Sequence, residues 1–545
     1  MCAATSWLNL VPRNPLKLAR VATAILVFTG LTIAFIDFRG FAPVHLGHVL
    51  AHAQFVPGFV SLLAGAIGTV FFVVGLIIAL AIGRIYCSAI CPLGILQDII
   101  TRIAGWFPRK KKLLPFAKPL TAVRQVFLWG TVAAIVAGWG GFALALVDPY
   151  SNFGRIVSTL ARPLLTVANN SLVGLANAAG SQSLYRVEAP WAVGGALLLP
   201  TIFLTLVAVM SALRGRLYCN TLCPVGTALG MLSKFAAFRI AIDKTACTKC
   251  GDCLRSCKAQ CIDLRAGTID ASRCVACYNC VGVCEHHGIG YRFSWKKKPA
   301  TAKAITATAA TSLTANDPQR RAFLASIAGG VAASSVVLNH ARAALPSDEI
   351  TPALVRSGEA SRAICPPGSK SQDQFLDRCT SCHLCVSACP THVLQPALLE
   401  YGVEGLLKPR LDYTSAFCLF ECTRCIEVCP DDALSLPDLA TKQVTQIGVA
   451  DFHQSRCIVE VNGTDCAACS EHCPTKAVTT KPFRDNLRLP SLDQSLCIGC
   501  GACEYACPVK PTKAILVTGR RVHARAEKLV EKKATAPVQT GDFPF

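Results

Sequence analysis

Acidic side chains and substrate-binding motifs are both scarce in this sequence. Asp and Glu number 33 against 54 Lys and Arg, so the formal net charge is +21. No glycine-rich nucleotide motif beside a strand–helix pattern is recognisable, nor is a molybdopterin-type domain. The C-x-x-C-H string at Cys379–His383 shares its cysteines with a longer cysteine run, so no c-type haem is expected. We therefore expect no active site for a small substrate in this chain.

Cysteine, by contrast, is abundant, with 31 residues in a 545-residue chain that is 52% apolar. Few disulfide scaffolds are this long, and the cysteine spacing does not suit them, so metal binding is the better interpretation. The apolar content argues against a purely soluble protein, and the length allows several domains.

Four uncharged stretches are apolar enough to cross a bilayer, which requires about 20 residues. They are Val21–Ile36, Phe55–Gly83, Val126–Val147 and Ala189–Leu213. Lys and Arg gather before the first stretch, between the second and third, and after the fourth. The positive-inside rule then predicts a multi-pass protein of the bacterial inner membrane, a four-helix unit with both ends in the cytoplasm. These stretches contain no histidine, so no transmembrane haem is expected.

Two segments on the predicted periplasmic side allow more than one interpretation. Pro163–Tyr185 is uncharged, but its Asn, Gln, Ser and Gly residues make it a poor lipid-facing helix, so we expect a periplasmic or re-entrant loop. His45, His48 and His52 could lie along one helix stripe and accept protons from a quinol. An interfacial helix with polar histidines is the simpler alternative.

The element GRIYCSAICPLG at residues 83–94 recurs as GRLYCNTLCPVG at residues 215–226, each time just past an uncharged stretch. Cysteines four positions apart face the same way on a helix, and the proline marks a break. We expect convergence at the cytoplasmic membrane face of Cys87, Cys91, Cys219 and Cys223. They could complete a seventh Fe–S site or act as redox dithiols. Packing of free cysteines at two helix breaks is the alternative.

The next cysteines follow C-x2-C-x2-C-x3-C twice, the run of bacterial two-cluster ferredoxins, in which the fourth cysteine binds the other cluster. One expected ligand set is Cys247, Cys250, Cys253 and Cys284, and the other is Cys274, Cys277, Cys280 and Cys257. Structural zinc favours two C-x2-C pairs separated by a longer loop, which does not fit. Lys258 and Glu285 replace the usual proline after each fourth cysteine, which weakens the turn signal but leaves the ligands complete.

The segment after this run changes in character. Residues 295–319, rich in Ala, Thr and Lys, are typical of a linker. Arg320 and Arg321 then precede a mildly apolar Ala/Gly/Ser segment that ends near Ala344. This resembles a twin-arginine export signal within the chain, with an ordinary fifth membrane helix as the alternative. Either interpretation predicts that the remainder lies in the periplasm.

That remainder contains four more cysteine motifs, each followed by proline. Two have the regular spacing: Cys379, Cys382, Cys385 and Cys389, and Cys497, Cys500, Cys503 and Cys507. Two between them are stretched: Cys418, Cys422, Cys425 and Cys429, and Cys457, Cys466, Cys469 and Cys473. The chain is therefore predicted to hold six [4Fe-4S] clusters. Because the outer motifs match each other, as do the inner ones, we expect nested pairing, first with fourth and second with third.

The clusters also account for part of the basic charge. A [4Fe-4S] cluster with four thiolates carries about two negative charges when oxidised, so six would offset about twelve positive charges. Binding to nucleic acid is therefore not needed to explain the composition, and no nucleic-acid partner is expected.

The first 295 residues resemble the NapH/MauN type of membrane ferredoxin, and residues 320 to about 520 resemble the NapG/MauM type of exported four-cluster ferredoxin. The chain thus resembles a fusion of the two. The resemblance implies an electron carrier, a component of a quinol dehydrogenase, that draws on the quinol pool in the membrane lipid and supplies a periplasmic redox partner protein. An accessory factor that matures or reactivates a periplasmic metalloenzyme is the alternative.

The expected fold class is a membrane α-helical four-helix unit plus α+β bacterial ferredoxin-like domains. The predicted organisation is a membrane domain over residues 1–240, a cytoplasmic two-cluster ferredoxin domain over 241–294, a linker over 295–319, the twin-arginine-like segment over 320–344, a periplasmic four-cluster ferredoxin domain over 345–520 and a tail over 521–545.

Overall fold

A computed structural model of the chain describes residues 14–37, 44–64, 68–106, 116–178, 180, 181, 185–187, 195–293, 363–436 and 438–528. The predicted linker and the twin-arginine-like segment, with Arg320, Arg321 and Ala344, lie outside these residues. So does most of the predicted tail.

Helices from the N-terminal part of the chain form a bundle. They are α1 (Pro15–Ile36), α2 (Val44–His52), α3 (Phe55–Ala64), α4 (Gly68–Ile82), α5 (Tyr86–Ala89), α6 (Pro92–Ala104), α7 (Thr121–Ala134), α8 (Gly140–Val147), α9 (Pro149–Ile156), α10 (Arg162–Ala178), α11 (Gly195–Arg214), α12 (Leu217–Thr221) and α13 (Pro224–Ser233). Two π-helical turns, Ile135–Trp139 and Val157–Ala161, join α7 to α8 and α9 to α10. Aromatic rings fill the core, where Phe153 contacts Phe28 at 5.3 Å and Phe35 at 6.3 Å between ring centres.

Three described helices are long and apolar enough to cross a membrane: Pro15–Ile36, Thr121–Val147 and Ala196–Arg214. The predicted second span, Phe55–Gly83, is wrong as a single helix, because the chain is divided there into α3 and the shorter apolar α4. Phe72 on α4 contacts Phe55 at 4.9 Å and Phe59 at 5.8 Å between ring centres, so α3 folds back along α4. Gly58 allows this approach, since a Cβ there would press on Phe72 at 3.1 Å.

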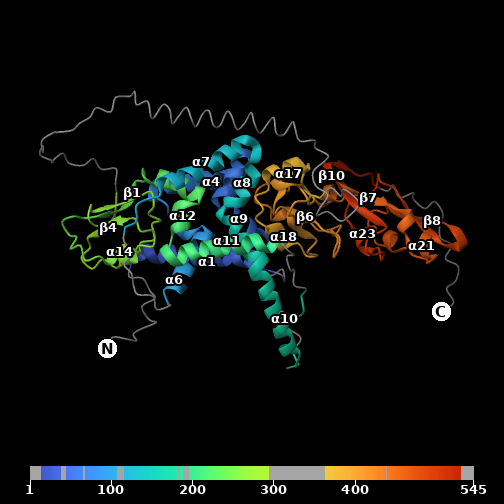
Figure 1. Cartoon of the computed structure of the whole chain (residues 1–545), viewed down its shortest axis with the longest axis horizontal. Helices are drawn as coiled ribbons and strands as arrows, with labels where there is room; N and C mark the ends of the chain where they lie inside the picture. Colours follow the sequence, from blue (N-terminus) through green and yellow to red (C-terminus); the bar gives the residue numbers. More distant parts are fainter. Residues whose placement is uncertain are drawn as a thin grey trace, which may run out of the picture.

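The segment Pro163–Tyr185, expected to be a periplasmic or re-entrant loop, is helical for most of its length, in α10. This helix is not among the described helices that are long and apolar enough to cross a membrane. This helix leaves the bundle and projects from its side (Figure 1). Its asparagines bind the chain that returns after the helix: Asn169 donates to the Tyr185 carbonyl at 3.2 Å, and Asn170 donates to the carbonyl of Val187 at 2.7 Å. The two asparagines therefore form hydrogen bonds with the returning chain and are compatible with a helix.

The first ferredoxin run forms a small α+β domain at one end of the bundle. Its elements are β1 (Phe238–Ile242), α14 (Asp252–Ser256), β2 (Ile262–Asp263), β3 (Thr268–Ile269), α15 (Asn279–Gly282) and β4 (Ile289–Phe293). β1 pairs antiparallel with β4, with Phe238 opposite Phe293, and β2 pairs antiparallel with β3. The strands thus frame the two cysteine motifs, whose ligands lie in the connecting loops and short helices.

The C-terminal part forms two consecutive ferredoxin-like units. The first contains α17 (Gln372–Arg378), α18 (Leu384–Ala388), β5 (Leu394–Pro396), β6 (Pro409–Leu411) and α19 (Arg424–Glu427). The second contains α20 (Leu439–Lys442), β7 (Thr445–Phe452), α21 (Ile458–Asn462), α22 (Ala468–Glu471), β8 (Val478–Pro482), β9 (Arg488–Leu492), α23 (Ala502–Ala506) and β10 (Ile515–Arg525). β5 pairs with β6, β8 with β9, and β7 with β10, all antiparallel.

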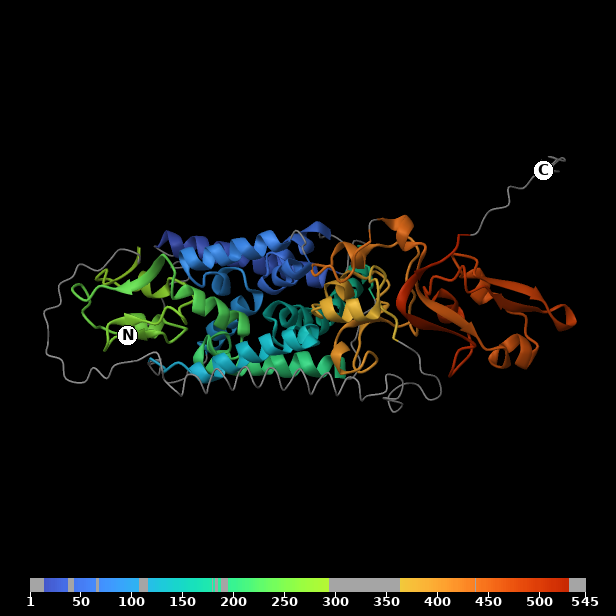
Figure 2. The same cartoon turned by 90° about the horizontal axis from the view of Figure 1, so that it is seen from above.

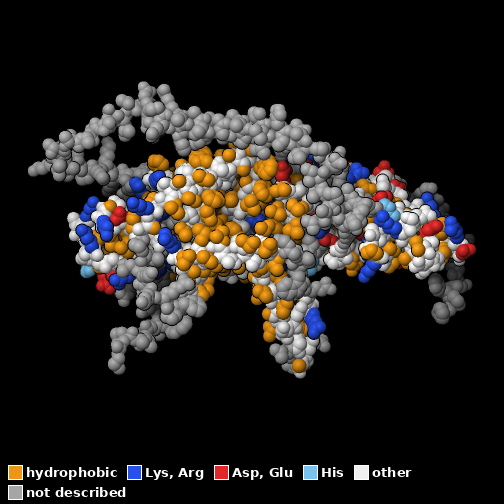
Figure 3. Space-filling model, in the orientation of Figure 1, with side chains coloured by type: hydrophobic (Ala, Val, Ile, Leu, Met, Phe, Trp, Pro, Cys, Tyr) orange, Lys and Arg blue, Asp and Glu red, His pale blue; other side chains and the backbone are white. Residues whose placement is uncertain are grey.

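The bundle separates the ferredoxin domains. In Figures 1 and 2 the domain with β1, β4 and α14 lies at one end of the bundle, and the unit with α17, α18 and β6 lies at the other. The second C-terminal unit, with β7, β8 and α21, extends farther in the same direction. Hydrophobic side chains gather over the bundle between these ends, as Figure 3 shows, whereas charged side chains of both signs lie on the domains at both ends.

Candidate metal centres

The first ferredoxin domain brings its eight motif cysteines together in two groups. Thiol group 1 lines one recess and consists of Cys247, Cys250, Cys253 and Cys284. Thiol group 2 consists of Cys257, Cys274, Cys277 and Cys280, which line another recess together with Cys261 from outside the motifs. The fourth cysteine of each motif thus joins the other motif, as the spacing predicted. Cys280 and Cys253 interact electrostatically, so the two groups are neighbours.

A repeated backbone turn shapes the regularly spaced motifs. The residues on both sides of the second cysteine have positive φ, as in Lys249 (59°) with Gly251 (93°), and Ser381 (57°) with His383 (64°). Such left-handed residues curl the loop tightly, and curled loops of this kind form concavities that bind anions and Fe–S clusters. The two stretched motifs lack this pair of residues, because Thr423 and Ala467 keep negative φ.

The C-terminal motifs pair sequentially, so the nested prediction is wrong. Cys389, the fourth cysteine of the first motif, lines a recess with the first three cysteines of the second motif. Electrostatic interactions define four groups. Thiol group 3 is Cys379, Cys382, Cys385 and Cys429; group 4 is Cys389, Cys418, Cys422 and Cys425; group 5 is Cys457, Cys466, Cys469 and Cys507; group 6 is Cys473, Cys497, Cys500 and Cys503.

The groups follow one another in the order 3, 4, 6, 5. Cys385 of group 3 interacts with Cys425 of group 4. The Cys418 amide of group 4 donates to the carbonyl of Cys500 in group 6 at 3.0 Å. Cys503 of group 6 interacts in turn with group 5 through Cys469. The C-terminal domain therefore contains a continuous row of thiol groups.

The donor set fits [4Fe-4S] clusters. Groups 1, 2 and 4 each line a recess. Among the described residues, no three His, Cys, Asp or Glu side chains lie close enough to bind one metal ion jointly. A cubane cluster spreads its four thiolates over four iron atoms, which suits thiols arranged around a recess.

The four cysteines of the repeated C-x3-C-P element lie together inside the bundle. We call them the central cysteines: Cys87, Cys91, Cys219 and Cys223. Each is at most 4% exposed. Cys91 interacts electrostatically with the other three. Cys91 and Cys223 are also the N-caps of α6 and α13, whose first residues are the prolines, because proline at a first helical position needs no partner for its nitrogen.

An arginine from each repeat reaches across to the other. Arg84 donates to the Cys219 carbonyl at 3.1 Å, and Arg216 donates to the Cys87 carbonyl at 2.6 Å. Both guanidinium groups are almost fully buried, at 0% and 1% exposure. Two buried cations beside four thiols favour an anionic ligand set, since opposite charges stabilise each other strongly in a poorly hydrated interior.

Glycines in the repeat make room for these arginines. A Cβ at Gly94 would overlap the Cys87 carbonyl, and one at Gly226 would overlap the carbonyl of Cys219. Gln97 adds a polar contact, donating from Nε2 to Cys219 Sγ at 3.1 Å. The sequence analysis singled out the cysteines and missed these partners, although the arginine and glycine recur in both copies of the element.

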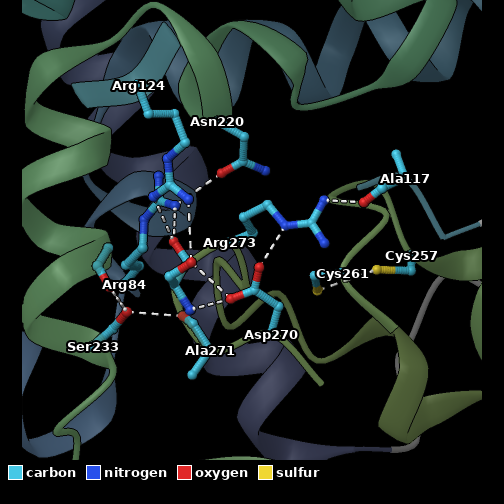
Figure 4. A network of polar contacts seen from close by, with 12 residues as sticks. Arg84, Ala117, Arg124, Asn220, Ser233, Cys257, Cys261, Asp270, Ala271 and Arg273 are labelled. Atoms are coloured by element: carbon cyan, nitrogen blue, oxygen red, sulfur yellow. Dashed lines mark hydrogen bonds and ion pairs between the residues drawn. The ribbon is translucent and has the colours of Figure 1, made fainter. Parts of the chain in front are cut away.

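The central cysteines connect to thiol group 2 through Arg84. Its Nη1 donates to the Ser272 carbonyl at 2.8 Å, and Arg124 donates to the same carbonyl at 3.1 Å. Figure 4 shows both guanidinium groups converging on this loop, with Asp270 bound to Arg273 close by. Arg84 also interacts electrostatically with Cys274 of group 2.

Arg155 provides the corresponding connection to thiol group 3. It interacts electrostatically with Asp148 and Tyr218 in the bundle and with Cys379 and Cys382 in the C-terminal domain. Gly154 beside it allows close contact, because a Cβ there would overlap the Cys382 carbonyl. The central cysteines therefore lie between groups 2 and 3.

Two of the candidate histidines meet on α2. His48 Nε2 and His52 Nε2 are 3.1 Å apart, and the His52 ring is 4% exposed. Burial and His48 together lower the pKa of His52, against an opposite effect of Asp432. The His45 side chain lies outside the described residues.

Two cysteines outside the motifs are also buried. Cys261 Sγ lies 3.6 Å from Cys257 Sγ of group 2, and Cys365 packs in the first C-terminal unit. Cys2 lies outside the described residues.

Comparison with known proteins identifies three matching family models. A model described as a 4Fe-4S binding domain matches residues 64–113 and 196–242, which contain the central cysteines. Two models described as 4Fe-4S dicluster domains match residues 378–434 and 462–511. The first dicluster match contains two consecutive motifs in full, and the second contains the last motif and all of the motif before it except Cys457. Both matches join neighbouring motifs, in agreement with sequential pairing.

Similar proteins are ferredoxin-type proteins. The chain is 30% identical over 166 residues to ferredoxin-type protein NapF of Escherichia coli strain K12, which is 30% of this chain and 90% of that protein. It is 28% identical over 196 residues to methylamine utilization ferredoxin-type protein MauM of Methylophilus methylotrophus, which is 35% of this chain and 83% of the relative. It is 28% identical over 199 residues to ferredoxin-type protein NapG of Escherichia coli strain K12, which is 34% of this chain and 80% of that protein. No solved structure matches.

Proposed function

The chain belongs to the ferredoxin-type 4Fe-4S proteins represented by NapF, MauM and NapG, and from this premise we propose that it carries electrons across a membrane. The donor is quinol in the lipid phase, and the acceptor is an oxidoreductase in the periplasm. In this proposal the bundle is a NapH/MauN-type membrane part fused to a NapG/MauM-type exported part.

One observation carries the proposal: the central cysteines lie between two ferredoxin domains at opposite ends of an apolar bundle. Thiol group 2 adjoins them through Arg84. Thiol group 3 is linked to them through Arg155 and Tyr218, because Tyr218 interacts electrostatically with Arg155 on one side and with Cys219 and Cys223 on the other. The row of groups from one end of the molecule to the other is 1, 2, central cysteines, 3, 4, 6, 5. A row that runs through the bundle supports transfer from one side of a membrane to the other.

Each of the six thiol groups would hold one [4Fe-4S] cluster, which accepts and returns a single electron when bound. The central cysteines would hold a seventh Fe–S centre or act as paired dithiols. The chain's own contribution is to fix the thiols, to exclude water from the central cysteines and to balance negative charge there with Arg84 and Arg216.

Basic residues support an orientation for the protein. Lys and Arg gather at the bundle end that bears the first ferredoxin domain, where Arg20, Arg216 and Lys258 meet Asp98. The positive-inside rule favours this end as the cytoplasmic one. The C-terminal domain at the opposite end would then be periplasmic, beside the histidine pair of α2.

Quinol-dependent reduction of the purified full chain in lipid nanodiscs tests the function. A reduced quinol analogue should bleach the visible absorbance of the clusters stepwise, because each quinol releases two protons and supplies two electrons, enough for two of the six one-electron clusters. The Cys87→Ser/Cys219→Ser variant should retain the clusters of the six thiol groups. It should lose fast reduction of the clusters on the far side of the central cysteines. Cys365→Ser, outside every motif, is the matched control. Absence of bleaching in the wild type would contradict a quinol donor and favour the accessory factor.

A further inference from the structure

An open recess lies where the bundle meets the first ferredoxin domain. It opens between the start of α7 and the end of α11, two of the membrane-crossing segments. Its polar lining is contributed by both the bundle and the domain and includes Lys118, Arg214, Arg216, Asn220, Gln260 and Arg273. None of the motif cysteines lines it, so it is distinct from the thiol groups.

The lining carries basic charge without an acidic residue of its own. Two carboxylates outside the lining form ion pairs with lining residues: Asp98 with Arg216, and Asp270 with Arg273. Asp98 is already surrounded by Arg216 at 2.8 Å, Arg20 at 2.6 Å and Lys258 at 3.3 Å. One carboxylate therefore faces three cations, and Lys118 and Arg214 add two more charges at the rim. The surroundings of the recess have a clear excess of positive charge.

Two wall residues retain hydrogen-bond donors. Arg273 is 4% exposed and uses Nε for Asp270 and Nη1 for the Ala117 carbonyl, both at 2.7 Å, while its Nη2 has no partner. Asn220 accepts from Arg84 through Oδ1, and Figure 4 shows its amide nitrogen turned away from Arg84. Because Nη2 of Arg273 is shielded from solvent, an anion in the recess would first meet the exposed Lys118 and Arg214, whose charged donors form strong hydrogen bonds to anions.

We infer that this recess binds a phosphate group. Guanidinium groups suit phosphate because their donors match its oxygens in pairs. Arg214 ends a membrane-crossing helix, so the recess lies at the depth where phospholipid headgroups occur. Basic pockets at the ends of membrane helices bind acidic headgroups. The phosphate is therefore that of an anionic phospholipid or a free inorganic ion, and both sources share the same chemistry.

Native mass spectrometry of the full-length protein in detergent tests the site, with phosphatidylglycerol, phosphatidylcholine and inorganic phosphate as probes. The variant is Lys118→Gln/Arg214→Gln, in which both changes are at exposed positions. The matched control is Lys244→Gln/Arg255→Gln, with the same loss of charge at exposed positions of the first ferredoxin domain. Each basic side chain near an anionic headgroup strengthens binding by roughly fivefold, so the variant should bind phosphatidylglycerol roughly 30-fold more weakly.

The outcomes separate the sources. Tight binding of phosphatidylglycerol, weakened in the recess variant and kept in the control, supports a lipid headgroup. Binding of inorganic phosphate with the same dependence on the variant, and no preference for phosphatidylglycerol over phosphatidylcholine, supports a free ion. Equal binding of every probe by the wild type, the variant and the control would overturn the inference. None of these results depends on electron transfer.

Discussion

Replacing Asp98 by Asn removes the carboxylate on which three cations converge at the junction of bundle and first ferredoxin domain. The side chain of Asp98 is 12% exposed, and those of Arg20, Arg216 and Lys258 are 9%, 1% and 26% exposed. Removing one partner of a buried ion pair costs about 3–5 kcal/mol because the other charge is left buried. Since these groups retain some access to water, we expect the lower end, about 3 kcal/mol, which is roughly a 150-fold change in an equilibrium constant.

Hydrogen exchange at Arg216 measures this change directly. Its amide donates to the Lys258 carbonyl at 3.1 Å, so exchange requires the domain to separate from the bundle. Asp98→Asn should speed that exchange by roughly 150-fold in the full chain. Asp252→Asn is the control, because its pair with Arg255 is exposed and contributes less than about 1 kcal/mol. Unchanged exchange in Asp98→Asn would refute the assigned role of this carboxylate.

The pH dependence of the same junction follows from Asp98. Burial alone would raise the pKa of its carboxyl, but Arg216, Lys258 and Arg20 outweigh burial and hold the pKa well below its usual range. A carboxyl with a depressed pKa stabilises the folded state fully above its unfolded pKa of about 4, and this stabilisation is lost as pH falls below that value. The protection factor of the Arg216 amide, which is corrected for the intrinsic pH dependence of exchange, should therefore be constant near neutrality and fall only in acid.

Three further predictions concern the cysteine groups, the glycines and the topology. For sequential pairing, Cys389→Ser/Cys418→Ser should lose no more iron than Cys389→Ser alone, because both residues belong to group 4; additive losses would restore nested pairing. Gly226→Ala should lower the free energy of unfolding by about 1–3 kcal/mol, because the added methyl group would overlap the Cys219 carbonyl. Gly174→Ala is the control and should leave the free energy of unfolding unchanged, because Gly174 has open space around it. Reporter fusions after residues 290 and 400 should report opposite compartments, and the same compartment at both would contradict the proposed orientation.

Cysteine spacing was enough to predict which cysteines group within a regular motif. It did not predict which motifs pair with each other. A regular run such as Cys247 to Cys257 contains the turn that brings three thiols together, so its ligand groups could be predicted from sequence alone. The partner of Cys389 could not, because pairing between motifs depends on strands β5 and β6, which return the second motif beside the first. Similar spacing in the outer motifs reflects a shared local turn and carries no information about which motifs are neighbours.

Hydropathy likewise did not predict where the helices begin and end. Phe55–Gly83 is uncharged throughout, yet packing of Phe72 against Phe55 and Phe59 stabilises a helical hairpin that composition does not distinguish from one long helix. The polar composition of Pro163–Tyr185 did not predict the helix α10, because Asn169 and Asn170 bind the backbone that returns after the helix, a partner that the sequence does not reveal. The convergence of the central cysteines was predictable because a duplicated element predicts equivalent positions.

Electron transfer through sealed vesicles tests the central proposal most directly. Proteoliposomes that contain the full chain would receive a membrane-impermeant reductant outside and enclose an impermeant electron acceptor, whose reduction is followed optically. The account predicts rapid reduction with the wild type and with Cys365→Ser, and loss of that reduction with Cys87→Ser/Cys219→Ser while the iron of the six thiol groups remains. Equal rates for all three proteins would contradict transfer through the central cysteines.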